Sequence, residues 1–276
     1  MKICYSIILF VCFSYVYSLN TASDGNGRYA MQMLKLALSK IDTPYELITD
    51  ENLISQSRNI ELVSSGQSDL LWAATNQQME DTLLPIRIPL YKGLLGHRIF
   101  IIRKGDQPRF DQVSTIEDLR RLTFGQGKTW ADTEILRSNK FTVITANKYK
   151  GLFYMLDGSR FDAFPRGVQE PWQELEDNSS LPLTVEQKIM LVYRMPFYFF
   201  TTKNNGKLAK DIESGLNKSL EDGSFDRIFL NDPMIKSVIE KANLKERKVF
   251  KMDNPALPKE TPLERSELWL DIGSLQ

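Results

Sequence analysis

Few side chains in this 276-residue chain have the chemistry for covalent catalysis or metal binding. His97 is the only histidine, and the only cysteines are Cys4 and Cys12, both close to the N-terminus. Zinc and copper sites usually need several histidine or cysteine ligands. A Ser-His-Asp triad would have to use His97, at the start of a predicted strand. The sequence therefore predicts no metal, no cofactor and no catalytic residue.

Two arginines have surroundings that suit the recognition of an anion. Arg166 follows a predicted strand and lies between Pro165 and Gly167, where its planar fork could bind a carboxylate or phosphate through two hydrogen bonds. Arg87 lies between two isoleucines, just before Pro89. Each has a simpler alternative: an internal salt bridge for Arg166, and an outward-facing position on an alternating strand for Arg87.

A glycine-rich stretch, residues 125–129, adds further candidates. It is similar to part of a phosphate-binding P-loop, but Leu122 stands where that motif requires glycine. A glycine-rich turn that leads from a strand into a helix still directs free N–H groups at an anion. We expect Gln126, Trp130 and Thr133 to line the ligand site. Packing of Trp130 on the surface of its own lobe is the alternative.

The N-terminus predicts export. Lys2 precedes an almost wholly apolar stretch, residues 3–11, and small Ser18 offers a cleavage site, which together are the parts of a secretory signal peptide. We expect residues 1–18 to be removed and the mature protein to be periplasmic; cleavage after Ser14 and an uncleaved anchor are the alternatives. Removing Lys2 from the 35 basic residues leaves 34, against 35 acidic ones. Such a balance gives no reason to expect binding to nucleic acid or to anionic membranes.

Helix and strand patterns alternate along the rest of the chain. Amphipathic or leucine-periodic stretches predict helices, and short apolar runs predict buried strands. The clearest helices are residues 28–40 and 208–220, and the clearest strands are residues 69–74, 98–103 and 197–202. This alternation is typical of α/β folds.

Five motifs, in a fixed order, carry a resemblance to a known family. They are residues 58–69, Thr75 with Pro89-Leu90-Tyr91, residues 115–119, residues 158–163 and residues 208–229. In this order and spacing the chain resembles the type II periplasmic solute-binding proteins, in particular family 3, whose members bind polar amino acids for ABC importers. The resemblance implies that Thr75 and Tyr91 belong to the ligand site of the first lobe.

The resemblance also implies an α/β fold of two lobes. Each lobe would be a mixed, mostly parallel sheet flanked by helices, with the ligand bound in the cleft between the lobes. Residues 98–103 and 197–202 would be the two crossover strands. Lobe one would comprise residues 19–103 and 203–276, and lobe two residues 104–202. The expected partners are a small-molecule ligand and an inner-membrane transporter or sensor, and the expected state is a monomer.

Two charges that amino-acid binders of this family use are absent. The resemblance implies an arginine for the ligand carboxylate soon after Thr75, and an aspartate for its ammonium group later, in lobe two. Residues 76–81 contain no arginine, and residues 164–167 contain Arg166 in place of the aspartate. We therefore predict a small polar, anionic ligand. A periplasmic dehydratase on the same fold, using Glu170 with Arg166, and a ligand-free interaction module are the alternatives.

Overall fold

The computed structural model describes residues 17–21, 27–49 and 56–274. The predicted signal peptide, residues 1–18, lies outside the described residues except for its last two. Strand β1 (Tyr17–Thr21) pairs in parallel with β2 (Tyr45–Thr49) over its whole length. The cleavage site predicted after Ser18 would fall within this strand, whereas a cut after Ser14 would precede it.

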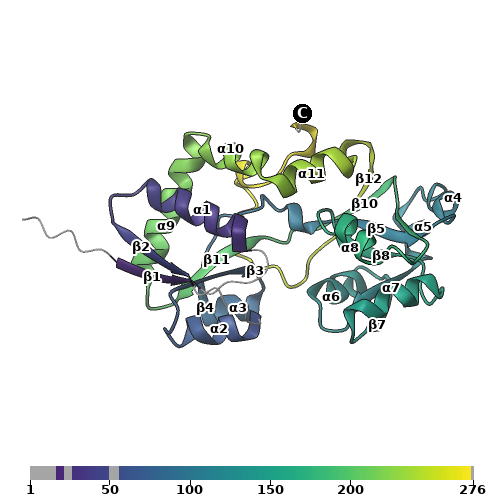
Figure 1. The fold of residues 1–276 in the computed structure, drawn as a ribbon, viewed down its shortest axis with the longest axis horizontal. Coiled ribbons are helices and arrows are strands. Elements are labelled where there is room, and N and C mark those ends of the chain that lie inside the picture. The colour runs from purple at the N-terminus through teal and green to yellow at the C-terminus, as the bar shows by residue number, and fades with distance from the viewer. Residues whose placement is uncertain (1–16, 22–26, 50–55, 275–276) are drawn as a thin grey trace, which may run out of the picture.

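The first of two lobes is built on a five-stranded sheet in the order β2-β1-β3-β11-β4 (Figure 1). β3 (Leu70–Ala74) is parallel to β1, whereas β11 (Phe197–Thr202) is antiparallel to both β3 and β4 (Leu83–Ile86). The strands predicted at residues 69–74 and 197–202 are thereby confirmed. Both are apolar because they lie inside the sheet with both faces covered.

Helices α1 (Gly27–Ser39) and α9 (Gly206–Glu221) pack against each other in this lobe, and α9 also contacts β4 and β11. Their backbones approach closely because position 215 is a glycine: a Cβ atom on Gly215 would lie 2.0 Å from the carbonyl oxygen of Ala37. The helices predicted at residues 28–40 and 208–220 are confirmed. The other helices of this lobe are α2 (Gln56–Ser64), α3 (Gln77–Thr82), α10 (Ser224–Asn231) and α11 (Pro233–Lys241).

The second lobe contains a sheet in the order β12-β10-β5-β8 and a separate parallel pair, β6 with β7. The central strand β5 runs antiparallel to β8, β9 and β10, and only β10 and β12 are parallel, so this sheet is mixed rather than mostly parallel. The strands are β5 (His97–Arg103), β6 (Thr123–Gly127), β7 (Thr142–Ala146), β8 (Phe164–Gly167), β9 (Leu183–Val185), β10 (Ile189–Val192) and β12 (Lys248–Lys251). Its helices are α4 (Gln107–Phe110), α5 (Ile116–Arg120), α6 (Ala131–Ser138), α7 (Tyr149–Asp157) and α8 (Pro171–Asp177).

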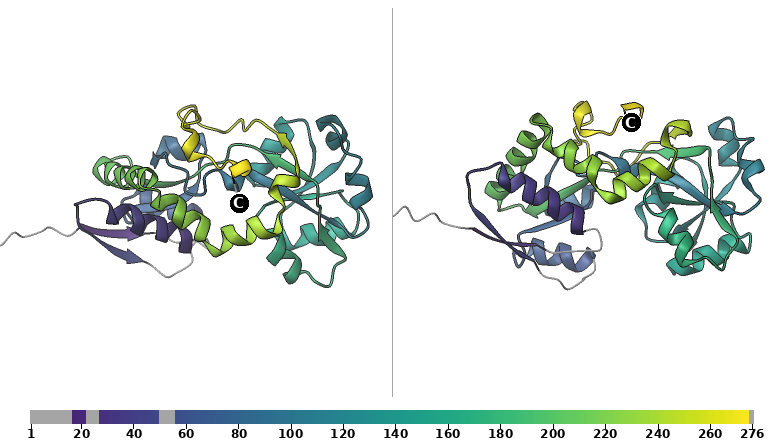
Figure 2. Two further views of the ribbon diagram at one scale, coloured as in Figure 1. Left: turned by 90° about the horizontal axis from the view of Figure 1, so that it is seen from above. Right: turned by 45° about the horizontal axis from the view of Figure 1, so that its top comes forward.

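Within residues 56–274 the chain passes between the two lobes four times. Residues 87–96 lead from β4 to β5, and residues 193–196 lead back from β10 to β11. Residues 242–247 then lead from α11 to β12, and residues 252–261 return to the first lobe. The two views of Figure 2 show the C-terminal segment running between the two halves of the molecule.

Three parts of the predicted lobe boundaries differ from this arrangement. Residues 197–202 were expected to end lobe two as a crossover strand, but β11 lies wholly in the sheet of the first lobe, between β3 and β4. Residues 98–103 were expected to end lobe one as a crossover strand, but β5 lies wholly in the sheet of the second lobe. Residues 203–276 were expected to stay in lobe one, but β12 pairs with β10. β12 is short and its residues are largely exposed, so the sequence carries no strong strand pattern there.

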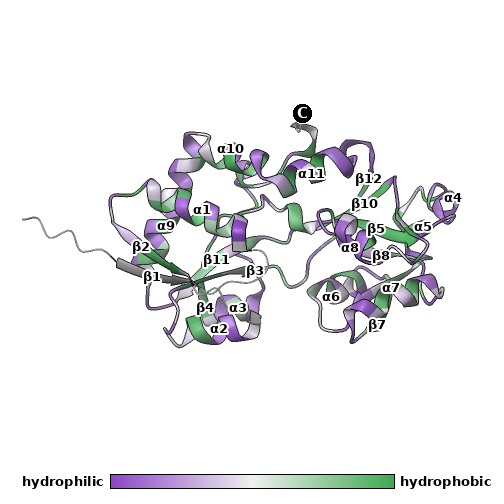
Figure 3. Cartoon of the chain, viewed as in Figure 1, coloured by the Kyte–Doolittle hydropathy of each residue, from purple (hydrophilic) through white to green (hydrophobic). Residues whose placement is uncertain are grey.

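Each lobe has its own aromatic core. Tyr91 packs on Tyr29 and Phe197 in the first lobe, whereas Phe124 packs on Phe100 and Phe141 in the second. Figure 3 shows the apolar character of β5 and the mixed character of the helices around it. Within the described part of the chain, no helix is long and apolar enough to cross a membrane.

Candidate functional site

Arg166, the main candidate from the sequence, is enclosed by partners from its own lobe. Its Nε donates to both carboxylate oxygens of Glu174 at 2.9 Å, and its Nη2 donates to Oε1 at 2.6 Å. Glu170 lies 3.0 Å from the same Nη2. The guanidinium also lies over the rings of Trp130, at 5.0 Å, and Phe164, at 4.8 Å. The internal salt bridge considered from the sequence is therefore present.

A second buried arginine extends this network. Arg98, the second residue of β5, donates from Nε to the hydroxyl of Tyr193 at 2.7 Å and lies 2.8 Å from Asp132 Oδ1. The Tyr193 hydroxyl in turn donates to Asp132, and burial raises the pKa of Tyr193 well above its ordinary value. Glu170 lies 3.7 Å from Arg98, so this carboxylate is shared between the two arginines.

Carboxylates outnumber guanidinium groups in this network. Asp132, Glu170 and Glu174 face Arg98 and Arg166, which gives a formal charge of one unit negative. Glu170 is the most accessible member, with 31% of its side chain exposed, while both arginine side chains are 10% exposed or less. Glu174 occupies Nε and Nη2 of Arg166, so an anion that bound these two atoms would have to displace it, and breaking such a buried pair costs about 3–5 kcal/mol.

The polar side chains of the predicted glycine-rich turn bind backbone of their own lobe. Gln126 is 1% exposed and donates from Nε2 to the carbonyl of Pro165 at 3.2 Å. The Thr133 hydroxyl donates to the carbonyl of Gly127 at 2.7 Å. Trp130 stacks on Phe164 with its ring 6.2 Å away and 13° from parallel. The structure thus brings Trp130 to Arg166, but Gln126 and Thr133 stabilise the turn.

In the first lobe, a buried glutamate joins two of the predicted residues. Glu80 accepts a hydrogen bond of 2.7 Å from the Thr75 hydroxyl and forms an ion pair with Arg87. Only 3% of the Glu80 side chain is exposed. The predicted residue Tyr91 lies elsewhere, in the core of the lobe, where its ring is 4.6 Å from Tyr29.

The two charged groups lie on either side of one crossing segment, residues 193–196. From the first lobe, the backbone N–H of Thr75 donates to the carbonyl of Pro196 at 3.0 Å. From the second lobe, Arg98 contacts the sulfur of Met195 at 3.2 Å. The Thr75–Glu80–Arg87 group and the Arg98–Arg166 network therefore lie at the hinge-side ends of their two sheets, where ligands bind in open α/β sheets.

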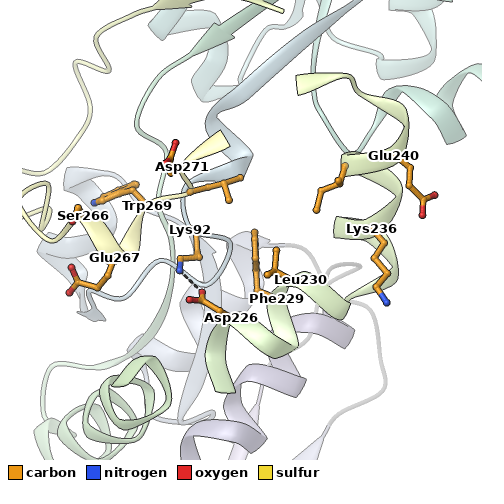
Figure 4. A pocket seen from close by; sticks show the side chains of 12 residues that line it. Lys92, Asp226, Phe229, Leu230, Lys236, Glu240, Ser266, Glu267, Trp269 and Asp271 are labelled. Carbon is orange, nitrogen blue, oxygen red and sulfur yellow. Dashed lines mark hydrogen bonds and ion pairs between the residues drawn. The ribbon is translucent and has the colours of Figure 1, made fainter. Parts of the chain in front are cut away.

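A pocket of about 910 Å³ lies elsewhere, and none of the seven predicted site residues lines it. It opens between α10, α11 and the C-terminal segment, over Lys92, Phe229 and Trp269 (Figure 4). Among the described residues, no cluster of histidine, cysteine or acidic side chains could hold a metal ion. His97 is buried and lies 3.2 Å from the carbonyl of Gly93, outside both charged groups.

No protein-family model matches the sequence, and no curated protein matches it. Among solved structures, the probable amino-acid ABC transporter extracellular-binding protein YtmK from Bacillus subtilis is similar, with a TM-score of 0.56 and 15% identity over 78% of this chain and 96% of that one. The amino-acid ABC transporter substrate-binding protein AbpA from Streptococcus pneumoniae, bound to L-arginine, gives 0.51 and 16% over 82% and 97%. An ancestral arginine-binding protein bound to arginine gives 0.51 and 16% over 78% and 96%.

The chain has the type II periplasmic-binding-protein fold. The match to amino-acid-binding proteins of family 3 covers most of the chain at low identity, as the order of motifs predicted. Within this type II fold, residues 76–81 place Glu80, rather than an arginine, beside Thr75. The members of the two charged groups that the sequence did not single out as site residues are Glu80, Arg98, Asp132, Glu174 and Tyr193. No local sequence pattern predicts that these residues belong to a charged group, because the groups that they bind come from other elements.

Proposed function

We propose that this chain is an extracytoplasmic solute-binding protein that holds a small polar ligand between its lobes. The type II fold and the amino-acid-binding proteins that share it support this proposal. So do the two charged groups, which flank the same crossing segment from opposite lobes and could meet one ligand from both sides. The ligand would pass to a transporter or a sensor.

The ligand that fits best carries a cationic or neutral polar group toward the second lobe. The observation that supports this ligand is the pairing of Arg166 with two carboxylates of the protein, Glu174 and Glu170. The sequence alone predicted an anion at Arg166. In the structure, two carboxylates already balance the charge of this buried guanidinium, so an anionic ligand would add a third negative charge beside it. Glu170 is the exposed member of a net-negative network, so it would accept hydrogen bonds from a ligand ammonium or guanidinium.

One observation keeps an enzyme as a second candidate. Glu170 lies 3.0 Å from Arg166, the pairing of a carboxyl group with a cation that the dehydratase alternative requires. Fold does not separate a receptor from an enzyme, because function depends on the site. The test must therefore look for consumption of the ligand as well as for binding.

A thermal-shift screen tests the proposal. The protein is heated with amino acids, polyamines, dicarboxylates, sugar phosphates and neutral sugars, and each stabilising compound is then incubated and assayed for turnover. A true ligand at one hundred times its Kd should raise the Tm by roughly 5–10 °C. Stabilisation by a cationic or neutral polar compound without turnover supports the receptor, and turnover supports the enzyme. If no compound of the panel raises the Tm, the receptor and the enzyme are both rejected and the ligand-free interaction module is favoured.

A further inference from the structure

The last two crossings between the lobes are anchored by specific contacts. Residues 242–247 are held to the second lobe by Arg247, which donates from Nη1 to Glu186 at 3.2 Å and to the carbonyl of Ile189 at 3.0 Å. Both side chains of this ion pair are fully buried. Glu186 also accepts hydrogen bonds of 2.7 Å from two backbone N–H groups, so the anchor is part of the fold of the second lobe.

The return crossing, residues 252–261, is attached at both ends. Asn139 of the second lobe donates to the carbonyl of Asp253 at 2.7 Å and accepts from its N–H at 3.2 Å. Asn254 then donates to the carbonyl of Arg194, in the middle of the 193–196 crossing, at 2.9 Å. In the first lobe, Arg265 donates to Asn217 of α9 at 2.9 Å.

Trp269 lies against both of the other crossing segments. Its ring packs on Gly93, where a Cβ atom would lie only 2.7 Å from the ring carbon Cε3. The guanidinium of Arg194 lies 4.5 Å above the centre of the same ring. The neighbouring N–H of Leu270 donates to the carbonyl of Lys92 at 2.8 Å. One buried aromatic ring therefore touches residues 87–96 and residues 193–196 together.

A hinge movement between the lobes must change the backbone of these two segments, as well as that of the two later crossings. Lobes of this kind close by changes of φ and ψ in a few residues of the connecting segments. Lys92 and Gly93 have φ angles of 49° and 75°, in the left-handed region. Leu270 donates a hydrogen bond to Lys92 and Trp269 packs on Gly93, so both contacts stabilise this backbone conformation. A rotation about these residues would break the packing of the ring.

We infer that the C-terminal segment, residues 242–271, restrains the hinge, with Trp269 holding the two crossing segments in the arrangement of the structure. Ligand-driven movement of the lobes must then displace the tryptophan. This device is independent of which ligand binds.

The pocket beside Trp269 gives the ring room to move. Figure 4 shows Trp269 and Asp271 on one side of it, and Lys236 and Glu240 of α11 on the other. This open space of about 910 Å³ separates Trp269 from Lys236 and Glu240 of α11. Displacement of the tryptophan therefore needs no rearrangement of α11.

The restraint can be tested without ligand by measuring the distance between the lobes. Spin labels on Gln32→Cys of α1 and Tyr154→Cys of α7, both exposed, report this distance by double electron–electron resonance, in full-length chain with Cys4 and Cys12 replaced by serine. Trp269→Ala should widen the distribution. Other lobe arrangements should become about 5- to 30-fold more populated, the factor that corresponds to about 1–2 kcal/mol.

The matched control is Leu263→Ala, an exposed apolar residue of the same segment, which should leave the distribution unchanged. Arg194→Ala removes the stacking on Trp269 but keeps the ring in place, and should widen the distribution to a smaller extent. It also provides the test if Trp269→Ala does not fold. A folded Trp269→Ala protein with the distribution of the Leu263→Ala control would overturn the inference, as would an unchanged distribution in Arg194→Ala.

Discussion

Arg166 and Glu174 bind each other through three hydrogen bonds of 2.6–2.9 Å at the buried end of β8. The geometry is that of an arginine clamping a carboxylate, but the carboxylate belongs to the protein. The same holds in the first lobe, where Thr75 and Arg87 bind Glu80. At both places the protein supplies the negative charge that an anionic ligand would otherwise bring.

The Arg166–Glu174 pair should contribute to folding. Arg166→Ala leaves Glu174 without its main partner in a buried site, so we expect the free energy of unfolding to fall by about 3–5 kcal/mol. Arg58→Ala is the control, because the ion pair of Arg58 with Glu61 is solvent-exposed and should contribute less than about 1 kcal/mol. Equilibrium unfolding in urea measures both. Equal losses in the two variants would show that Arg166 is not structurally paired in solution.

Removal of Glu80 should make the first lobe receptive to a carboxylate. Glu80→Ala frees the Thr75 hydroxyl and the Arg87 guanidinium, so zwitterionic amino acids should raise the Tm of the variant more than that of the wild type. Asp81→Ala is the matched control, since Asp81 is the next acid along α3 and is exposed. The thermal-shift panel described above provides the measurement. If both variants respond like the wild type, the Glu80 carboxylate does not block the site.

His97 should make stability depend on pH. Burial lowers its pKa from 6.5 to about 4, with Arg194 and Arg98 contributing. The unfolded chain therefore takes up a proton near pH 6.5, whereas the folded protein takes it up only near pH 4. The contribution of His97 to the free energy of unfolding is present above pH 6.5 and is lost as the pH falls toward 4. Between pH 7 and 5 the free energy of unfolding should fall by about 2 kcal/mol.

His97→Gln provides the control for this dependence. His97 is the only histidine, and few carboxylates titrate above pH 5, so the variant should lose most of the change in that range. Urea unfolding at pH 7, 6 and 5 compares the two proteins. A wild-type protein whose stability is flat over this range, or a variant with the same slope, would contradict the assigned role of His97.

Much of the fold could be predicted from local sequence patterns. The apolar run at residues 197–202 coincides with β11, and the leucine repeat at residues 208–220 lies within α9. The strand that the sequence predicts just before Arg166 is β8, but it begins only at Phe164 and contains Arg166, because the residues before it turn to hydrogen-bond with Thr123. β12 was missed because its four residues bury little apolar surface and depend on pairing with β10.

The candidate site was predictable in position but not in charge. Arg166 is expected just after a strand but instead lies within β8, paired with Ile99 of β5, and Trp130 lies beside it. Glu174, however, is eight residues further on and one turn into α8, and nothing in a single sequence says that its side chain returns to Arg166. Long-range pairs such as Arg98 with Asp132 depend on tertiary packing in the same way.

The central claim is that a ligand binds between the lobes with a cationic group toward Glu170. Calorimetric titration of the wild type, Glu170→Gln and Glu176→Gln with L-arginine and L-glutamate tests it directly. Glu176 is the matched control, because it is an exposed glutamate of α8, the helix whose N-cap is Glu170. We predict tighter binding of L-arginine than of L-glutamate, and a loss of about tenfold or more in L-arginine affinity in Glu170→Gln alone. Tighter binding of L-glutamate, strengthened by Glu170→Gln, would contradict it.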